Sequence, residues 1–368
     1  MKRILHVVGQ MDRAGAETMI MNLYRTIDKT QFQFDFLYFT NRNCDYDDEI
    51  RNLGGKIYRI VTSNPILRMK ETIRLLRQQP QWEVLHCHTL FSNAFHIYAA
   101  YKAKIPERIS HSHNTQDSPS SKNSIIVWIY HYLSRIIQSK YSTRFVACGI
   151  AAGKYLFPKK GSDVVIFPNS IDLQMFVDVA EKEQDYLRRE FGLNKNTLIL
   201  LQLGRLEEVK NHRFSIAIAQ SLKNMEVDFR LFFVGQGSLK EPLLRTIESV
   251  KLEKEIILLG VRSDIPKILA GTDVLLMPSF FEGFPVVLVE SQAAGIPALI
   301  ANTISLEVDL GVQLIYFESL NNSSEVWSKQ IFEIISQNKI TAEERLKILK
   351  KQGFDIRTNC DRLEILYS

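Results

Sequence analysis

The first half of the chain alternates between two patterns of apolar and polar positions. Apolar runs at 3–8 and 32–39 are typical of buried strands, whereas residues 16–27 repeat apolar side chains every three or four positions, as one face of a helix does. Further elements are predicted as strands at 56–60, 84–87 and 108–111 and a helix at 67–78. Strands that alternate with helices predict a parallel sheet with helices on both faces.

The alternation begins again after residue 196. Five more strands are predicted, at 198–203, 229–234, 256–259, 274–277 and 297–300. We therefore expect an α/β protein with two doubly wound domains that face each other across a cleft. The expected divisions are 1–175 for the first domain, 176–345 for the second, and 346–368 for a C-terminal helix that packs back on the first. Ligands of such sheets bind beyond the carboxyl ends of the strands.

Length and composition agree with this fold class. The 368 residues suit two domains better than one core, and 45% hydrophobic with 24% charged residues is typical of globular proteins. The four cysteines are scattered without a C-x-x-C pair, which argues against a disulfide framework and fits a reducing cytosol. The first apolar run is too short for a signal peptide, and no apolar stretch reaches the ~20 residues that span a bilayer. We therefore expect a cytoplasmic protein.

Charge is distributed unevenly between the two halves. Residues 1–178 carry 23 Lys and Arg against 15 Asp and Glu, a net charge of +8, whereas residues 179–368 carry 23 against 26, a net charge of −3. A basic half indicates an anionic partner such as a phosphate or a membrane surface, although a chance bias on a solvated surface gives the same count. The basic residues do not cluster with aromatic residues as in known nucleic-acid-binding modules, so a nucleic-acid partner is not expected.

Glycine-containing turns follow several strands of the second half. Gly204 and Arg205 begin a turn that ends with Lys210, just before a predicted helix. A glycine lets the backbone approach a ligand, and cations beside a helix start favour an anion, although a turn with two solvated cations has the same sequence. Gly235 and the segment Gly260-Val261-Arg262 follow two further strands, and each is a weak signal alone.

Two carboxylates stand eight positions apart in PSFFEGFPVVLVESQAAGIPAL, residues 278–299. Glu282 is predicted in a strand-to-helix turn, and Glu290 on the second turn of a helix that begins at Pro285 and ends at Gly295. An unpaired charge is costly to bury, which favours a ligand for both. Carboxylates suit sugar and ribose hydroxyls, because each accepts several hydrogen bonds. A helix-start carboxylate and a partly exposed helix residue are the structural alternatives.

Taken together, four motifs resemble those of family 4 glycosyltransferases. They are the E-x7-E spacing of the two glutamates, the G-R-x-x-x-x-K-N turn at 204–211, the P-N-S-I-D segment at 168–172 and the A-G-A-E loop at 14–17, with Ser170 and Ala14 in place of glycines. The resemblance extends over nearly the whole chain. Within the family, the chain is most similar to the bacterial glycosyltransferases that make exopolysaccharides and capsular polysaccharides. The resemblance implies the GT-B architecture, in which one Rossmann-like domain binds the acceptor and the other binds the nucleotide-sugar.

The resemblance also implies a role for each matching residue. Arg205 and Lys210 would stabilise the leaving diphosphate, which is electrostatic catalysis. Glu282 would act beside the donor sugar, and Glu290 would bind the ribose. The other donor-side positions would be Gly15, Gly204, Gly235, Val261, Arg262, Gly283, Phe284 and Pro285. The family retains the anomeric configuration, commonly uses a UDP-sugar and commonly needs no metal, so neither a metal nor another cofactor is expected.

The histidines near strand ends form two i, i+2 pairs, so each pair shares one side of its strand. They are His86 with His88 and His111 with His113. No cysteine or carboxylate at typical spacing completes a zinc site. In the family a histidine at the end of an N-domain strand reaches the donor sugar, which implies a catalytic role for His113, with His111 as the alternative and His88 on the acceptor side. The D-x-D sequence at 45–47 matches the metal motif of the other large glycosyltransferase fold, but its polar surroundings indicate a solvated loop.

Residues 122–144 mix apolar and aromatic side chains with Lys122, Arg135, Lys140 and Arg144. This mixture is typical of an interfacial helix on an anionic membrane, although a helix packed within the first domain would show it too. A peripheral position on the inner face of the plasma membrane, and a glycan or lipid-linked acceptor, would agree with the membrane interpretation.

Three alternatives to a glycosyltransferase stay open at this point. A dinucleotide-dependent oxidoreductase fits the fold class, but the first loop lacks G-x-G-x-x-G. A nucleotide-sugar epimerase of the same architecture, or a non-catalytic subunit that binds sugar nucleotides, would carry the same turns. If a nucleoside diphosphate is released only when an acceptor is present, the protein is a transferase rather than an epimerase or a non-catalytic subunit.

Overall fold

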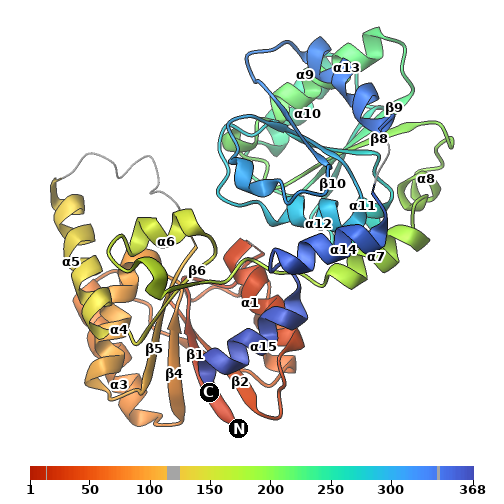
Figure 1. Ribbon diagram of the computed structural model, residues 1–368. Coiled ribbons are helices and arrows are strands. Elements are labelled where there is room, and N and C mark those ends of the chain that lie inside the picture. The colour runs from red at the N-terminus through yellow and green to blue at the C-terminus, as the bar shows by residue number, and fades with distance from the viewer. Residues whose placement is uncertain (14, 114–124, 338–339) are drawn as a thin grey trace. The chain divides into compact units, whose positions relative to one another are not determined.

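The computed structural model describes residues 1–13, 15–113, 125–337 and 340–368, and the chain divides into two compact units. The first unit comprises residues 1–170 and 355–368, and the second comprises 171–354 (Figure 1). Helix α14 (Ala342–Lys351), which straddles the division expected at 345/346, lies wholly within the second unit. The chain therefore returns to the first unit only for its last helix, α15 (Ile356–Tyr367).

The first unit is built on a seven-stranded parallel sheet with the order β3-β2-β1-β4-β5-β6-β7. Its strands are β1 (Lys2–Val7), β2 (Phe32–Tyr38), β3 (Ile57–Arg59), β4 (Trp82–Cys87), β5 (Glu107–Ser112), β6 (Arg144–Ala147) and β7 (Val164–Ile166). Besides α15, its helices are α1 (Gly15–Thr26), α2 (Asp47–Asn52), α3 (Pro65–Gln78), α4 (Asn93–Lys102), α5 (Ile125–Tyr141) and α6 (Ile150–Leu156).

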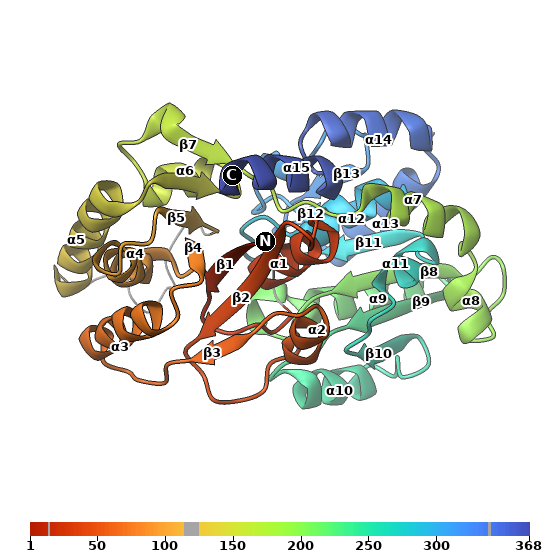
Figure 2. The same ribbon diagram turned by 90° about the horizontal axis from the view of Figure 1, so that it is seen from below.

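Both faces of this sheet are buried, because alternate residues of each strand point to opposite cores. On β1, Ile4 packs in the core that includes side chains of α1 and α15, whereas Leu5 and Val7 pack with Leu76 of α3 and Ile97 of α4. Helix α15 lies against α1 (Figure 2). The unit is thus completed by the C-terminal end of the chain.

The second unit is built on a six-stranded parallel sheet with the order β10-β9-β8-β11-β12-β13. Its strands are β8 (Leu198–Leu203), β9 (Phe229–Val234), β10 (Ile256–Gly260), β11 (Val274–Met277), β12 (Ala298–Ala301) and β13 (Ile315–Glu318). Besides α14, its helices are α7 (Leu173–Lys182), α8 (Tyr186–Glu190), α9 (His212–Asn224), α10 (Lys240–Ser249), α11 (Ile265–Ala270), α12 (Val286–Ala294) and α13 (Ser324–Ile335).

The expected α/β class with two doubly wound sheets is confirmed, and β8, β9 and β11 have the predicted bounds. The order of the second sheet reverses between β8 and β11. Doubly wound sheets bind ligands beyond the carboxyl ends of the strands at such a switch point. The two ends of this unit meet, because the amide of Ile171 donates to the carbonyl of Phe354 at 3.0 Å.

Candidate functional site

The turns that follow β8, β9 and β11 are packed together at the switch point. Gly204 has a φ of 151° and Gly235 a φ of 140°, a backbone region that favours glycine. A Cβ atom on Gly235 would lie 2.0 Å from the carbonyl oxygen of Gly204, so only glycine fits there. The amide of Phe280 donates to the carbonyl of Val209 at 2.9 Å, which ties the turn after β11 to the turn after β8. The three turns therefore form one continuous site.

Lys210 and Glu282 form an ion pair within this site. The Nζ atom of Lys210 lies 2.6 Å from Oε1 of Glu282, and the two side chains are only 18% and 11% exposed. The Nε2 atom of Gln202 donates to the carbonyl of Lys210 at 2.7 Å. Asn211 has a left-handed backbone, with a φ of 53°, and its Nδ2 atom donates to the carbonyl of Pro278 at 3.0 Å. These contacts hold the lysine in place beside the turn after β11.

The turn before α9 carries two basic and two acidic residues. This helix begins at His212, directly after the turn that carries Arg205 and Lys210. Arg205 is exposed, and its side chain has no hydrogen bond or ion pair within the described part of the chain. A helix N-terminus with two cations beside it can bind an anion such as a diphosphate.

Glu290 lies on α12 and is partly buried. Burial raises the pKa of its carboxyl group to about 7. Among the residues that the structure describes, none donates a hydrogen bond to this carboxyl group or pairs with it. The helix ends at Gly295 as predicted, with a φ of 78°, whereas Pro285 is the N-cap rather than the first helical residue. Because a partly buried acid without a partner is costly, Glu290 is suited to receive the hydroxyl groups of a ligand.

Of the remaining donor-side positions, some follow β11 in the second unit and one belongs to the first unit. Gly283 is exposed, and Phe284 stacks on Phe354 with ring centroids 5.5 Å apart. In the residues covered by the structure, the amides of Gly283 and Phe284 donate no hydrogen bond, so both are available to a ligand. Gly15 is an exposed residue at the start of α1 in the first unit, and Ala14 of the same motif lies outside the described residues.

The side chain of Arg262 is engaged within the second unit. Its guanidinium group donates to Asp264 at 2.6 Å and to Glu190 at 2.8 Å. The hydrogen bond with Asp264 raises the pKa of Arg262 and lowers the pKa of Asp264. A ligand at this turn would therefore meet the backbone and the exposed Val261 rather than a free guanidinium.

In the first unit, five histidines from three adjacent strands form one cluster. Hydrogen bonds link His6 Nδ1 to His88 Nε2 at 3.0 Å, His88 Nδ1 to His113 Nε2 at 2.9 Å, and His86 Nε2 to His111 Nδ1 at 3.2 Å. The sequence indicated two pairs but gave no reason to single out His6. The pairing register supplies it, because β1 places His6 opposite His86 on β4.

The two histidines considered for a catalytic role differ in accessibility. His111 is 1% exposed, whereas His113 keeps partial exposure, as does His88. Burial lowers the pKa of His113 to about 4, so its imidazole is neutral at pH 7. His113 is therefore the better placed of the two to meet a ligand.

The interpretation of residues 45–47 as a solvated loop is wrong for Tyr46 and Asp47, whereas Asp45 lies in an exposed turn. Asp47 is 2% exposed and is the first residue of α2. Its Oδ2 atom accepts a hydrogen bond from Nη2 of Arg59 at 2.6 Å, and Tyr46 is also buried. The acid is part of an internal ion pair, which a polar stretch of sequence could not reveal.

Helix α5 exposes an apolar face. Trp128 is 65% exposed and Tyr132 is 52% exposed, and their rings stack with centroids 5.7 Å apart. Ile125, Ile126, Ile129, Leu133 and Ile136 are exposed as well. Arg135 instead points inward and donates to the carbonyl of Tyr155 at 2.9 Å, and Lys122 lies outside the described residues. In the described ranges, no helix combines the length and apolar character needed to cross a bilayer.

Solved structures establish the fold type. The chain resembles the Anabaena protein Alr3699/HepE in complex with UDP with a TM-score of 0.77 at 16% identity, over 100% of this chain and 99% of that one. It also resembles WaaG, a glycosyltransferase involved in lipopolysaccharide biosynthesis, with a TM-score of 0.66 at 14% identity, over 97% and 95% of the two chains. Together with the two Rossmann-like sheets, these likenesses identify the GT-B fold.

Relatives in sequence establish the family. Residues 183–344 match the family described as glycosyl transferases group 1. The chain is 34% identical over 375 residues to "Putative glycosyltransferase EpsF" of Bacillus subtilis (strain 168), covering 100% of this chain and 96% of the relative. It is 27% identical over 318 residues to the UDP-Gal:alpha-D-GlcNAc-diphosphoundecaprenol alpha-1,3-galactosyltransferase of Escherichia coli, covering 81% and 79%. The protein thus belongs to the group 1 glycosyltransferases, the family that its glutamate pair and basic turn resemble.

Proposed function

We propose that this protein is a retaining glycosyltransferase that moves a sugar from a UDP-sugar to a glycan or lipid-linked acceptor in the synthesis of a cell-surface polysaccharide. The observation that carries the proposal is the Lys210–Glu282 pair beside the start of α9, with the unpaired Glu290 on α12. An anion site and a hydroxyl site on adjacent turns suit the diphosphate and the ribose of a nucleotide-sugar.

The proposed chemistry assigns one role to each of the side chains described above. The acceptor oxygen forms a bond to the anomeric carbon on the face from which the diphosphate leaves, and the acceptor proton passes to a diphosphate oxygen. Arg205 and Lys210 stabilise the negative charge that develops on the leaving group. Glu282 holds Lys210 and the donor sugar, while Glu290 accepts hydrogen bonds from the ribose. His113 contributes a neutral imidazole to the donor sugar. No metal takes part in this step, so transfer is expected to persist in EDTA.

A UDP-sugar is favoured as the donor by two comparisons. The Escherichia coli relative is named as using UDP-Gal, and HepE has been crystallised with UDP and with UDP-glucose. We expect UDP and UDP-sugars to raise the melting temperature of the protein more than GDP, ADP and their sugars do. Calorimetry with the same panel checks this. A preference for another nucleotide would overturn the assignment of a UDP-sugar as donor but would leave the assignment as a transferase unchanged.

Acceptor-dependent release of UDP tests the transferase itself. Transfer requires an acceptor for UDP to appear, whereas an epimerase converts one UDP-sugar to another without net release. The relatives named above are transferases, which favours transfer over the alternatives. NMR of the product's anomeric proton distinguishes retention from inversion. UDP release that no acceptor stimulates would contradict the proposal.

A lipid-linked acceptor would agree with the exposed apolar face of α5. The Escherichia coli relative is named for a diphosphoundecaprenol-linked sugar. We propose that α5 lies in the interface of the inner leaflet, with Trp128 and Tyr132 among the head groups and Lys140 near the anionic surface. The protein would then be cytoplasmic and peripheral.

Vesicle binding tests the role of α5. The protein is expected to sediment with vesicles that contain phosphatidylglycerol, and Trp128→Ser with Ile129→Ser should weaken this binding about tenfold or more, because two exposed apolar anchors are lost. Val165→Ser, at an exposed apolar residue on β7, is the matched control. Equal binding by both variants and the wild type would exclude α5 as the membrane contact.

A further inference from the structure

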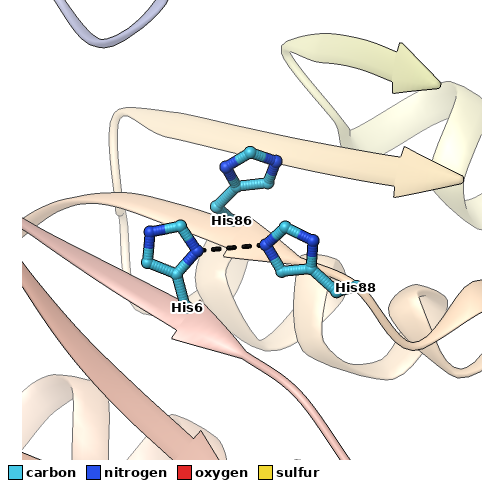
Figure 3. Close-up of side chains that lie close together, drawn as sticks. All are labelled: His6, His86 and His88. Atoms are coloured by element: carbon cyan, nitrogen blue, oxygen red, sulfur yellow. Dashed lines mark hydrogen bonds between the residues drawn. The ribbon is translucent and has the colours of Figure 1, made fainter. Parts of the chain in front are cut away.

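Three imidazoles from two neighbouring strands converge in the first unit. His6 lies on β1, His86 on β4, and His88 directly after β4 (Figure 3). Each offers one ring nitrogen, and these three nitrogens lie within 4.8 Å of one another. The Nδ1 atom of His6 and the Nε2 atom of His88 are 3.0 Å apart. Two ligands on a tetrahedral metal with bonds of about 2.0–2.1 Å are separated by about 3.3 Å, so the spacing is close to that of a ligand pair.

A small cavity adjoins these imidazoles. Its volume is about 10 Å³, and His6, His86, His88 and His111 line it together with Tyr367 and six apolar side chains. That volume is the size of a single water molecule or ion.

Two of the three imidazoles also have partners on the ring nitrogen that faces away from the group. The Nδ1 atom of His86 lies 2.7 Å from the hydroxyl group of Tyr367, and the Nδ1 atom of His88 lies 2.9 Å from Nε2 of His113. Histidines that bind metals almost always donate the opposite N–H to such a partner, which fixes the tautomer and the ring orientation. With those protons placed, Nε2 of both histidines carries a lone pair.

We propose that His6, His86 and His88 form a site for a late first-row transition-metal ion such as Zn²⁺ or Co²⁺. Imidazole nitrogen is the ligand that these ions favour, whereas Mg²⁺ and Ca²⁺ require oxygen ligands. The metal would replace the hydrogen bond between His6 and His88 and the contact of 3.2 Å between His86 and His111. It would join β1 to β4 and, through Tyr367, to α15. The site is independent of the proposed transfer, which uses no metal.

Metal titration of the full, untagged protein tests this site. After treatment with EDTA and desalting, the wild type is expected to bind one equivalent of Zn²⁺ in calorimetry and to show a higher melting temperature with Zn²⁺ but not with Mg²⁺. Co²⁺ should give the intense visible absorption of a four-coordinate ion. His6→Gln and His88→Gln are each expected to weaken Zn²⁺ binding by roughly 100-fold. His212→Gln, at a buried histidine of the second unit, is the control and should bind as the wild type does.

The result that would overturn the site is a wild type without saturable Zn²⁺ binding, or unchanged affinity in both variants. The cluster would then be a set of hydrogen-bonded neutral imidazoles only. Since either variant could fail to fold, zinc X-ray absorption on the loaded wild type provides a second measurement. Three imidazole ligands are expected, and one or none would also reject the proposal.

Discussion

Lys210→Ala is expected to lower kcat by about 100- to 1,000-fold while the protein stays folded. The ε-ammonium group lies beside the start of α9, where the charge of the leaving diphosphate would develop. The loss of one such preorganised electrostatic contact typically has an effect of this size. The substitution also leaves the Glu282 carboxylate partly buried without its partner, so the free energy of unfolding should fall by about 1–3 kcal/mol. Steady-state kinetics and urea unfolding measure the two effects.

Two further variants separate the catalytic effect from the loss of an ion pair. Lys223→Ala removes the partner of Glu255 in the same unit but far along α9 from its start, so activity should be retained. The double variant Lys210→Met with Glu282→Gln leaves no unpaired charge and should recover stability without recovering activity. Near wild-type kcat in Lys210→Ala would show that the lysine does not stabilise the leaving group.

Glu290→Gln is expected to weaken UDP binding about tenfold or more at pH 8 and, in the absence of ligand, to stabilise the protein. Burial raises the carboxyl pKa from 4.5 to about 7, so the folded protein binds this proton more tightly than the unfolded chain does. The stability from this group is fully present below about pH 4.5 and is lost as the pH rises through 7. Glutamine does not ionise, so the variant keeps its stability at high pH. At pH 8 the unfolding free energy of Glu290→Gln should therefore exceed that of the wild type by roughly 3 kcal/mol.

Measurements at several pH values identify the carboxyl group as the cause. Wild-type affinity for UDP should decrease below pH 7, because a protonated acid accepts fewer hydrogen bonds, whereas the affinity of Glu290→Gln should show little dependence on pH. Glu248→Gln, at an exposed glutamate of α10, is the control and should alter neither quantity. Equal stability of Glu290→Gln and the wild type at pH 5 and pH 8 would contradict the burial argument.

Local sequence patterns predicted much of the second unit. Strands β8, β9 and β11 are mainly apolar runs between polar turns, because both faces of a parallel sheet are covered. The turn at 204–211 and Glu282 were recognisable since each follows a strand end, and Glu290 since it lies on the helix after that turn. The pairing of Lys210 with Glu282 was not, because it joins turns after two different strands whose adjacency follows from the sheet order.

The first unit was harder to predict, because its main features also depend on which strands are neighbours in the sheet. The short strands β6 and β7, four and three residues long, gave no periodic signal and were not identified. His6 stands alone in an apolar run, and only the register of β1 with β4 brings it to His86. The partner of Asp47 is Arg59, twelve positions away on β3, so the polar run around it looked solvated. Contacts between strands, rather than composition, decide these features.

The hydrogen bond between Ile171 and Phe354 gives the second unit the form of an inserted domain. The backbone nitrogen of Ile171 and the carbonyl oxygen of Phe354 are 3.0 Å apart, so the two ends of the segment are adjacent. Such a segment can be inserted into another chain with little strain, since no gap has to be bridged. Residues 171–354 therefore suit expression as an independent fragment. Residues 1–170 do not, because they lack α15 and would leave the core side of α1 uncovered. Truncation at the C-terminal end of this chain therefore removes α15 and destabilises the N-terminal unit before the second unit.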